Sequence, residues 1–228
     1  MTAVLFDYPK SATFGRVLPK NKIYEHGNPN ATVRQLFVKQ VEQVVWQYKL
    51  APETIKLPAR PAVPEIQVFS IALKTPQLHE DVLKCIDNAI QFPILFELHF
   101  EGLVQAKACY KRPALSSSQK SMCAEISQWV SSDYFATQWQ SEVAARVPLP
   151  VALDMAALYE QLLRRLIPLV SRSGETIVAL VERAGQVRRK QKEVEQTKAR
   201  LSRARQFNRK VEFNAMLRNL YRELEELS

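Results

Sequence analysis

Prolines and glycines are distributed unevenly along the 228-residue chain, and this distribution constrains the fold more than any other feature of the sequence. Of 13 prolines and 5 glycines, the last proline is Pro168 and the last glycine is Gly185. Because these residue types disfavour helix interiors most strongly, the sequence beyond them can form helix without interruption. We therefore expect a folded body followed by an extended helical appendage.

The basic charge of the chain is concentrated in that appendage. Residues 183–210 contain eleven lysines and arginines against two glutamates, which accounts for the whole net charge of +9. The remainder of the chain is therefore close to neutral. Charge that is segregated on one element attracts a polyanion more strongly than the same charge dispersed over a surface.

The body reads as an α+β domain, with a small mixed β-sheet and flanking helices on one side. Apolar residues at spacings of three and four predict helices at 33–48 and 77–92, and Asn30 or Thr32 is a candidate cap of the first. The apolar run at 65–74 predicts a central strand. Two strands at 93–100 and 103–112 are joined by a turn at Glu101 and Gly102, a further strand is expected at 133–139, and a polar loop at 113–122.

Four segments are expected in order along the chain. An extended N-terminal arm without regular structure covers residues 1–30, and the α+β body covers residues 31–147. An amphipathic helix follows at 148–171. Residues 174–228 form a long basic helix with coiled-coil character, in which about 50 residues would span on the order of 75 Å, with a shift in the phase of its apolar seam near Ala204.

Catalytic motifs are scarce in this sequence. The three histidines, His26, His79 and His99, lack the spacings of metal or triad sites, and the glycines form no phosphate-binding loop. We expect no cofactor and no resident metal. A Mg²⁺-dependent nuclease remains an alternative, because that class uses a helix glutamate, a strand acid and an acid-x-Lys motif. The residues available for these roles are Glu42, Glu65 and Lys74, although Ala72 stands where the motif needs an acid.

The basic segment offers two kinds of surface. Its cations could neutralise nucleic-acid phosphates, with an affinity that falls steeply as salt rises; the candidates are Arg188, Arg189, Lys190, Lys192, Lys198, Arg200, Arg203, Arg205, Arg209 and Lys210. The following stretch mixes apolar side chains with asparagines, which is typical of a helix that packs on a partner. The candidate docking residues are Phe207, Asn208, Val211, Phe213, Asn214, Leu217, Leu220 and Leu224. Contact with DNA and contact with a protein are both open, as is a coiled-coil scaffold that touches no DNA.

Blocks spread over nearly the whole chain resemble a bacterial and archaeal family known only as a domain of unknown function. They include "FGRVLPKNKIYEH", "PEIQVFSIALK", "ACYKRP" and "RQFNRKVEFNAMLRNL". The resemblance implies a gene neighbourhood with helicases and DNA methyltransferases of restriction-modification and phage-defence systems. It implies no catalytic residues, and Ser70 and Ala72 depart from relatives that carry acids in this strand.

The expected function follows from these observations together. We expect a non-enzymatic accessory subunit of a DNA-targeting phage-defence system, which docks to a helicase or methyltransferase partner, with its basic C-terminal helix engaging DNA or that partner. The sequence has no basic segment followed by a long apolar stretch at its start, and no window that is apolar enough for a membrane span. The expected location is the cytoplasm, without membrane contact.

Overall fold

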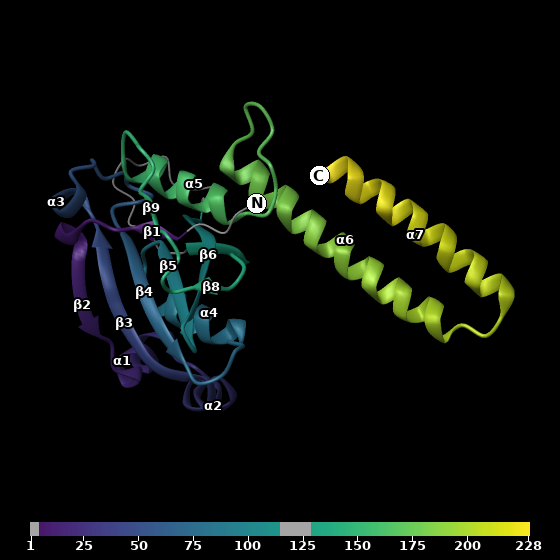
Figure 1. Ribbon diagram of the computed structural model, residues 1–228, viewed down its shortest axis with the longest axis horizontal. Helices are drawn as coiled ribbons and strands as arrows, with labels where there is room; N and C mark the ends of the chain where they lie inside the picture. Colours follow the sequence, from purple (N-terminus) through teal and green to yellow (C-terminus); the bar gives the residue numbers. More distant parts are fainter. Residues whose placement is uncertain (1–4, 115–128) are drawn as a thin grey trace. The chain divides into compact units, whose positions relative to one another are not determined.

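The chain folds into two units. The computed structural model describes residues 5–114 and 129–228, and the predicted polar loop at 113–122 lies largely outside these residues. Unit 1 ends at Leu166, and unit 2 runs from Ile167 to Ser228. The predicted α+β class is confirmed, with unit 1 holding the sheet and unit 2 holding two long helices (Figure 1).

A seven-stranded mixed sheet forms the centre of unit 1. Its main path runs β2-β3-β4-β5-β6-β7, and the short strand β8 (Gln140–Ser141) pairs with β6. Only β4 and β5 are parallel neighbours along this path. The strand bounds are β2 Thr13–Val17, β3 Val41–Leu50, β4 Ile66–Leu73, β5 Ile94–Phe100, β6 Leu103–Pro113 and β7 Trp129–Ala136. A separate parallel pair joins β1 (Phe6–Asp7) to β9 (Val147–Pro148).

The predicted central strand and hairpin are confirmed. Strand β4 is paired on both edges, and its mostly apolar side chains are largely buried on both faces of the sheet. The helix that links it to β5 is α4 (Glu80–Ala89). Strands β5 and β6 meet at Glu101 and Gly102, whose φ angles of 47° and 75° are those of a tight hairpin turn.

Helices cover both faces of the sheet, whereas the sequence predicted one. On one face, α1 (Lys20–Gly27), α2 (Ala31–Gln40) and α4 pack on a core that includes Phe69 and Phe96. On the other, α5 (Met155–Leu166) stacks Tyr159 on Tyr110 of β6. A short helix, α3 (Pro52–Ile55), follows β3.

Two predictions for the N-terminal third are wrong. Of the arm predicted at residues 1–30, the described part, residues 5–30, has regular structure, because β2 joins the sheet and α1 buries Ile23 in the core. The helix predicted at 33–48 ends at Gln40, and β3 begins at Val41. Its start is as expected, since the Asn30 side chain accepts a hydrogen bond from the Val33 amide at 2.9 Å.

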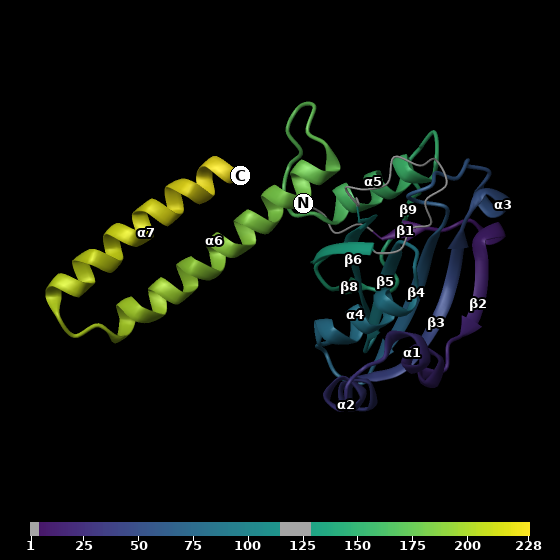
Figure 2. The same cartoon turned by 180° about the vertical axis from the view of Figure 1, so that it is seen from behind.

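Unit 2 is a helical hairpin and not the single long helix that the sequence predicted. Helix α6 (Ile177–Arg203) and helix α7 (Phe207–Leu227) run antiparallel on either side of a turn at residues 204–206 (Figures 1 and 2). We call this turn and the two helix ends that flank it, residues 200–210, the tip. The fold-back is favourable because it buries Val187 and Val194 of α6 and Leu217 of α7. A straight helix would leave these side chains in water.

Candidate nucleic-acid interface

The tip of the hairpin gathers arginines from both helices. Arg200 and Arg203 lie in the last turn of α6, Arg205 lies in the turn itself, and Arg209 lies in the first turn of α7. All four are exposed, and together with Phe213 they line a hollow of about 570 Å³. Reversal of the chain therefore brings together cations that a straight helix would spread along its length.

Two lysines of the predicted binding set are engaged elsewhere in the hairpin. Lys190 lies 2.8 Å from Glu223 of α7 and 3.2 Å from Glu193, and these hydrogen-bonded carboxylates raise its pKa. Lys198 lies 2.9 Å from Glu195, which raises its pKa, and its amine lies 5.9 Å from the centroid of the Tyr221 ring. These contacts lie within the hairpin, so the two lysines are less available to bind a ligand.

The tip arginines differ from these lysines. Across residues 5–114 and 129–228, no carboxylate forms an ion pair with Arg200, Arg203, Arg205 or Arg209. Lys210 is exposed beside them, and the other predicted binding residues, Arg188, Arg189 and Lys192, are exposed along α6. The positive charge that remains available is thus strongest at the tip.

The start of α7 is electrostatically unfavourable as it stands. Arg209 and Lys210 occupy its first turn, which contains no acid, and the Gln206 side chain makes no capping hydrogen bond. The positive end of a helix dipole favours anions and disfavours cations. A phosphate placed here would meet arginine side chains and uncapped backbone amides together.

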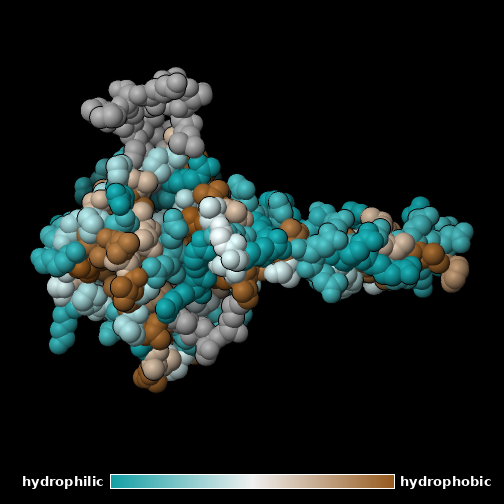
Figure 3. All heavy atoms as spheres, turned by 90° about the horizontal axis from the view of Figure 1, so that it is seen from above, coloured by the Kyte–Doolittle hydropathy of each residue, from teal (hydrophilic) through white to brown (hydrophobic). Residues whose placement is uncertain are grey.

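The predicted docking residues divide into two groups. Leu217 is buried in the hairpin and Leu220, Leu224 and Phe213 are half-buried, so these side chains pack largely within unit 2. Phe207 and Val211 are 78% and 48% exposed, and Asn208 and Asn214 are also exposed. On the side seen in Figure 3, the surface of the hairpin is mostly hydrophilic. The accessible docking surface is thus Phe207, Asn208, Val211 and Asn214, which we call the α7 patch.

The three nuclease candidates are not brought together. Glu65 precedes β4 and Lys74 follows it, so nine residue steps of roughly 3.3 Å separate them by about 30 Å. Glu42 lies on strand β3 and not on a helix, where it lines a hollow of about 560 Å³ with Ala72 and Lys20. Within the described ranges, no group of three His, Cys, Asp or Glu side chains could hold a metal ion.

Both lysines near Glu42 have structural contacts. The Lys74 amine donates to the Val38 carbonyl at 3.0 Å, and the Lys20 amine donates to the Val41 carbonyl at 2.6 Å. These carbonyls lie at the C-terminal end of α2, where cations are favoured by the helix dipole. Lys74 therefore caps a helix in this structure.

A buried polar cluster in unit 1 was missed by the sequence analysis. Asp87 of α4 and Lys111 of β6 are 4% and 3% exposed, and the Lys111 amine donates to the Asp87 carbonyl at 2.6 Å and to the Ile90 carbonyl. The Tyr134 hydroxyl donates to the Asp87 carboxylate. Burial raises the pKa of Asp87 and lowers the pKa of Lys111. An acid on the apolar side of α4 and a lysine inside a strand were the available signals.

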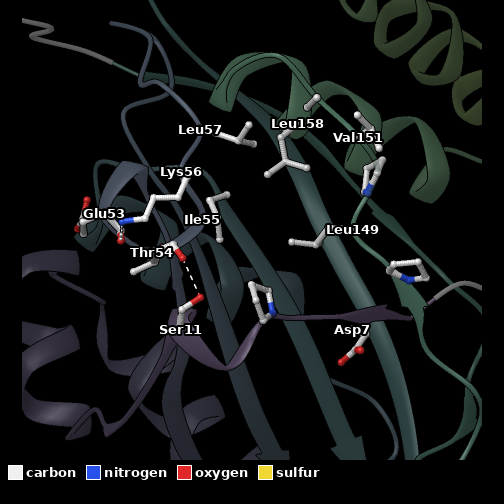
Figure 4. Close-up of a pocket in the computed structure, with 14 residues that line it drawn as sticks. Asp7, Ser11, Glu53, Thr54, Ile55, Lys56, Leu57, Leu149, Val151 and Leu158 are labelled. Carbon is white, nitrogen blue, oxygen red and sulfur yellow. Dashed lines mark hydrogen bonds between the residues drawn. The ribbon is translucent and has the colours of Figure 1, made fainter.

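Unit 1 also has an apolar hollow of about 780 Å³ between β1, α3 and the segment after β9 (Figure 4). Its walls include Ile55, Leu149 and Leu158, and the Ser11 hydroxyl donates to the Thr54 carbonyl at 2.8 Å beside it. Asp7 lies at its edge, apart from the Glu53 and Lys56 side chains (Figure 4). Its titratable groups do not converge, so the hollow has no catalytic arrangement.

Fold and surface together define an α+β protein with a basic helical hairpin. The chain belongs to the family described as Domain of unknown function (DUF4391), whose model matches residues 6–224. The predicted membership of a family of unknown function is thereby confirmed over nearly the whole chain. No curated protein and no solved structure matches it. Among the helices of residues 5–114 and 129–228, none is both long and apolar enough to cross a membrane.

Proposed function

We propose that the protein is a non-enzymatic accessory subunit of a prokaryotic DNA-targeting phage-defence system, acting in the cytoplasm. The α6–α7 hairpin contacts DNA through its tip and docks to a helicase or methyltransferase partner. Of the ten cations predicted to bind nucleic acid, five form the proposed DNA-contacting surface. These tip cations are Arg200, Arg203, Arg205, Arg209 and Lys210.

The observation that carries the DNA contact is the clustering of unpaired arginines at the tip. Unpaired cations held close together repel one another, so they cost stability unless an anion offsets the repulsion. The duplex backbone presents regularly spaced phosphates, and arginine binds phosphate through two parallel hydrogen bonds. Five cations within residues 200–210 therefore match a short run of phosphates without reading the bases.

The α7 patch supports the second half of the proposal. Phe207 is a large aromatic side chain that remains 78% exposed, and it lies next to Asn208 on the surface. Aromatic side chains are enriched at the centres of protein interfaces, where neighbouring amides add specific hydrogen bonds. The patch begins beside the tip, so a bound partner would be held close to the DNA.

Charge reversal at the tip tests the DNA contact. Arg203→Glu/Arg209→Glu changes the net charge by the same amount as Arg218→Glu/Arg222→Glu, which alters exposed arginines further along α7. Duplex binding should be measured by fluorescence anisotropy over a salt series. Since each lost phosphate contact reduces the salt slope by about 0.9, the tip variant should bind at least ~tenfold more weakly and with a smaller slope.

The control pair separates a site from a net-charge effect. Arg218→Glu/Arg222→Glu should stay within about threefold of the wild type, because long-range attraction between exposed charges is screened by salt. An equal loss of affinity in both variants would contradict a DNA contact at the tip. Undiminished binding by the tip variant would do the same.

Co-purification tests the partner contact. Phe207→Asp/Val211→Asp should abolish recovery of the proposed helicase or methyltransferase partner, since it places charges in a desolvated interface. Val38→Asp changes a 61% exposed valine on α2 and serves as the control. Recovery of the same partner by both variants would exclude the α7 patch as the docking surface.

A further inference from the structure

An aromatic ring lies among the arginines of the tip. Phe213 of α7 lines the hollow of about 570 Å³ together with Arg200, Arg203, Arg205 and Arg209. Within residues 5–114 and 129–228, no acidic side chain lines this hollow. Exposed arginines are sufficient to bind phosphates, and phosphates gain nothing from an apolar ring beside them. The hollow therefore offers a second kind of contact in addition to its charge.

Phe213 differs from the residues that follow it along the same side of α7. Towards the base of the hairpin, the side chains that pack within unit 2 are aliphatic, and they are Leu217, Leu220 and Leu224. At the tip this row ends in a ring that is only half-buried. Ala204, which also lines the hollow, has a single methyl group and is too short to cover the ring. Part of the Phe213 ring is therefore open to the hollow.

The Phe213 ring has no stacking partner in the part of the chain that the structure describes. The pairs of aromatic rings in contact there all lie in unit 1. The contact between a cation and a ring in the hairpin joins Lys198 to Tyr221 and leaves Phe213 uncovered. A flat ring can stack on an aromatic side chain in this situation. Nucleobases are rings of this kind, and each of the bases has a π-face.

Base pairing decides which bases could reach this ring. Inside a duplex each base is stacked between its neighbours, so only a base that has left the stack can lie flat against a side chain. The phosphates of an adjoining duplex can still meet the arginines of the tip. Hollows of about 300–1,000 Å³ hold small molecules, so a hollow of about 570 Å³ has room for one nucleotide. The arrangement thus fits DNA in which paired and unpaired segments adjoin.

We propose that the tip binds DNA at the boundary between duplex and single strand, with one unpaired base stacked on Phe213. This inference rests on the DNA contact proposed above and names the form of DNA that the same site prefers. Arg203, Arg205 and Arg209 hold the neighbouring phosphates. Because stacking uses the π-face of the base, the site accepts any of the bases. A helicase makes such boundaries when it separates strands, so this form of DNA agrees with the proposed partner.

Fluorescence anisotropy with the full chain compares three DNAs that share one duplex sequence. The first is blunt, and the second has a single-stranded deoxyadenosine overhang. The third has the same overhang built from abasic deoxyribose phosphates, which keeps every phosphate and removes the bases. The deoxyadenosine overhang should bind at least about fivefold more tightly than the abasic one, because a stacked base contributes about that much or more. This ratio should persist across a salt series in which all three affinities fall.

Substitutions at two phenylalanines locate the stacking surface. Phe213→Leu keeps an apolar side chain within the hairpin but removes the ring, so the two overhangs should bind equally. Phe213→Tyr keeps the ring and should keep the ratio of the wild type. Phe207→Leu removes an exposed ring that does not line the hollow, and it should also leave the ratio unchanged. Circular dichroism melting curves and the affinity for the blunt duplex show that the hairpin of each variant is folded.

Three outcomes would overturn this inference. They are equal binding of the two overhangs by the wild type, an unchanged ratio in Phe213→Leu, and loss of the ratio in Phe207→Leu, which would move the stacking to the α7 patch. In each case the DNA contact of the tip stands if Arg203→Glu/Arg209→Glu weakens binding of the blunt duplex and Arg218→Glu/Arg222→Glu does not. An equal loss in those two charge variants would remove the DNA contact and this inference together.

Discussion

Arg183 and Glu175 form a two-point ion pair at the base of the hairpin. Arg183 Nε donates to Glu175 Oε1 at 2.8 Å, and Arg183 Nη2 donates to Glu175 Oε2 at 2.9 Å. The same guanidinium donates to the carbonyls of Val170 and Leu227 at 2.7 and 2.8 Å. One side chain therefore ties the segment before α6 to the end of α7.

This pair predicts acid sensitivity of the hairpin. Hydrogen bonds from Arg183, and then from the Arg172 amide, lower the pKa of Glu175 from 4.5 to about 2. The Glu175 carboxyl therefore has a lower pKa in the folded protein than in the unfolded chain. The ion pair contributes its full stabilisation above pH 4.5, and this contribution is lost as pH falls toward 2. The melting temperature of wild type should fall across this window more than that of Glu175→Gln. Parallel curves for the two proteins would contradict this linkage.

Gly27→Ala should destabilise unit 1. A Cβ at Gly27 would lie 2.5 Å from the Cys85 carbonyl oxygen and 2.7 Å from its sulfur, so α1 and α4 would have to separate. Overpacking of this kind costs about 1–3 kcal/mol. Urea unfolding followed by circular dichroism measures the loss. The result would be contradicted by an unchanged midpoint.

Gly185→Ala provides the opposite expectation in the hairpin. It lies in the interior of α6, and the nearest atom to an added Cβ is Arg189 Nη1 at 3.5 Å, which is ordinary contact. Replacing a glycine inside a helix by alanine stabilises it by about 0.5–1 kcal/mol. The urea midpoint should therefore rise, and a fall would show that the hairpin needs flexibility at this point.

Lys111→Met should be among the most damaging single changes in unit 1. It leaves the Asp87 carboxylate, which is 4% exposed, without its nearby cation at 3.7 Å. Removing one partner of a buried ion pair costs about 3–5 kcal/mol. Asp87→Asn/Lys111→Met should recover part of this loss, because the stranded charge is gone as well. Additive effects in a double-mutant cycle would show that the two groups are not coupled.

Alanine substitutions should weaken duplex binding most at the cations that have no ion pair within the hairpin. Lys190→Ala and Lys198→Ala should weaken duplex binding less than Arg203→Ala or Arg205→Ala, since the lysines are already paired with glutamates. Each phosphate contact that is lost should lower the salt slope by about 0.9. Competition anisotropy at one DNA length is sufficient, and an inverted ranking would place the contact along α6 instead of at the tip.

The boundary between α2 and β3 shows why local pattern misled the sequence analysis. Val33, Leu36, Phe37, Val41 and Val44 continue one helical spacing across Gln40, where the helix ends. Beyond that point, β-branched valines pair with β2 on one side and β4 on the other. The partner strands come from distant parts of the chain, so no local window contained the information. Strand β4, with its long apolar run, was predictable from its own residues.

The candidate interface was predictable in composition but not in geometry. The charge cluster was visible in the sequence, and the shift of the apolar seam near Ala204 coincides with the observed turn. No glycine or proline marks that turn, so the sequence favoured one continuous helix. Which cations remain available depends on residues such as Glu223, which pairs with Lys190 only after the chain reverses.

The reversal at the tip also isolates the basic cluster within unit 2. Helix α6 has 27 residues, so at a rise of about 1.5 Å per residue its two ends are ~40 Å apart. One end is the tip, and the other is the base of the hairpin. At physiological ionic strength, the electrostatic effect of an exposed charge is largely screened beyond the Debye length of about 8 Å. Counter-ions therefore decouple the two ends of the hairpin. Acidification can loosen its base while the ion atmosphere around the tip stays as it was.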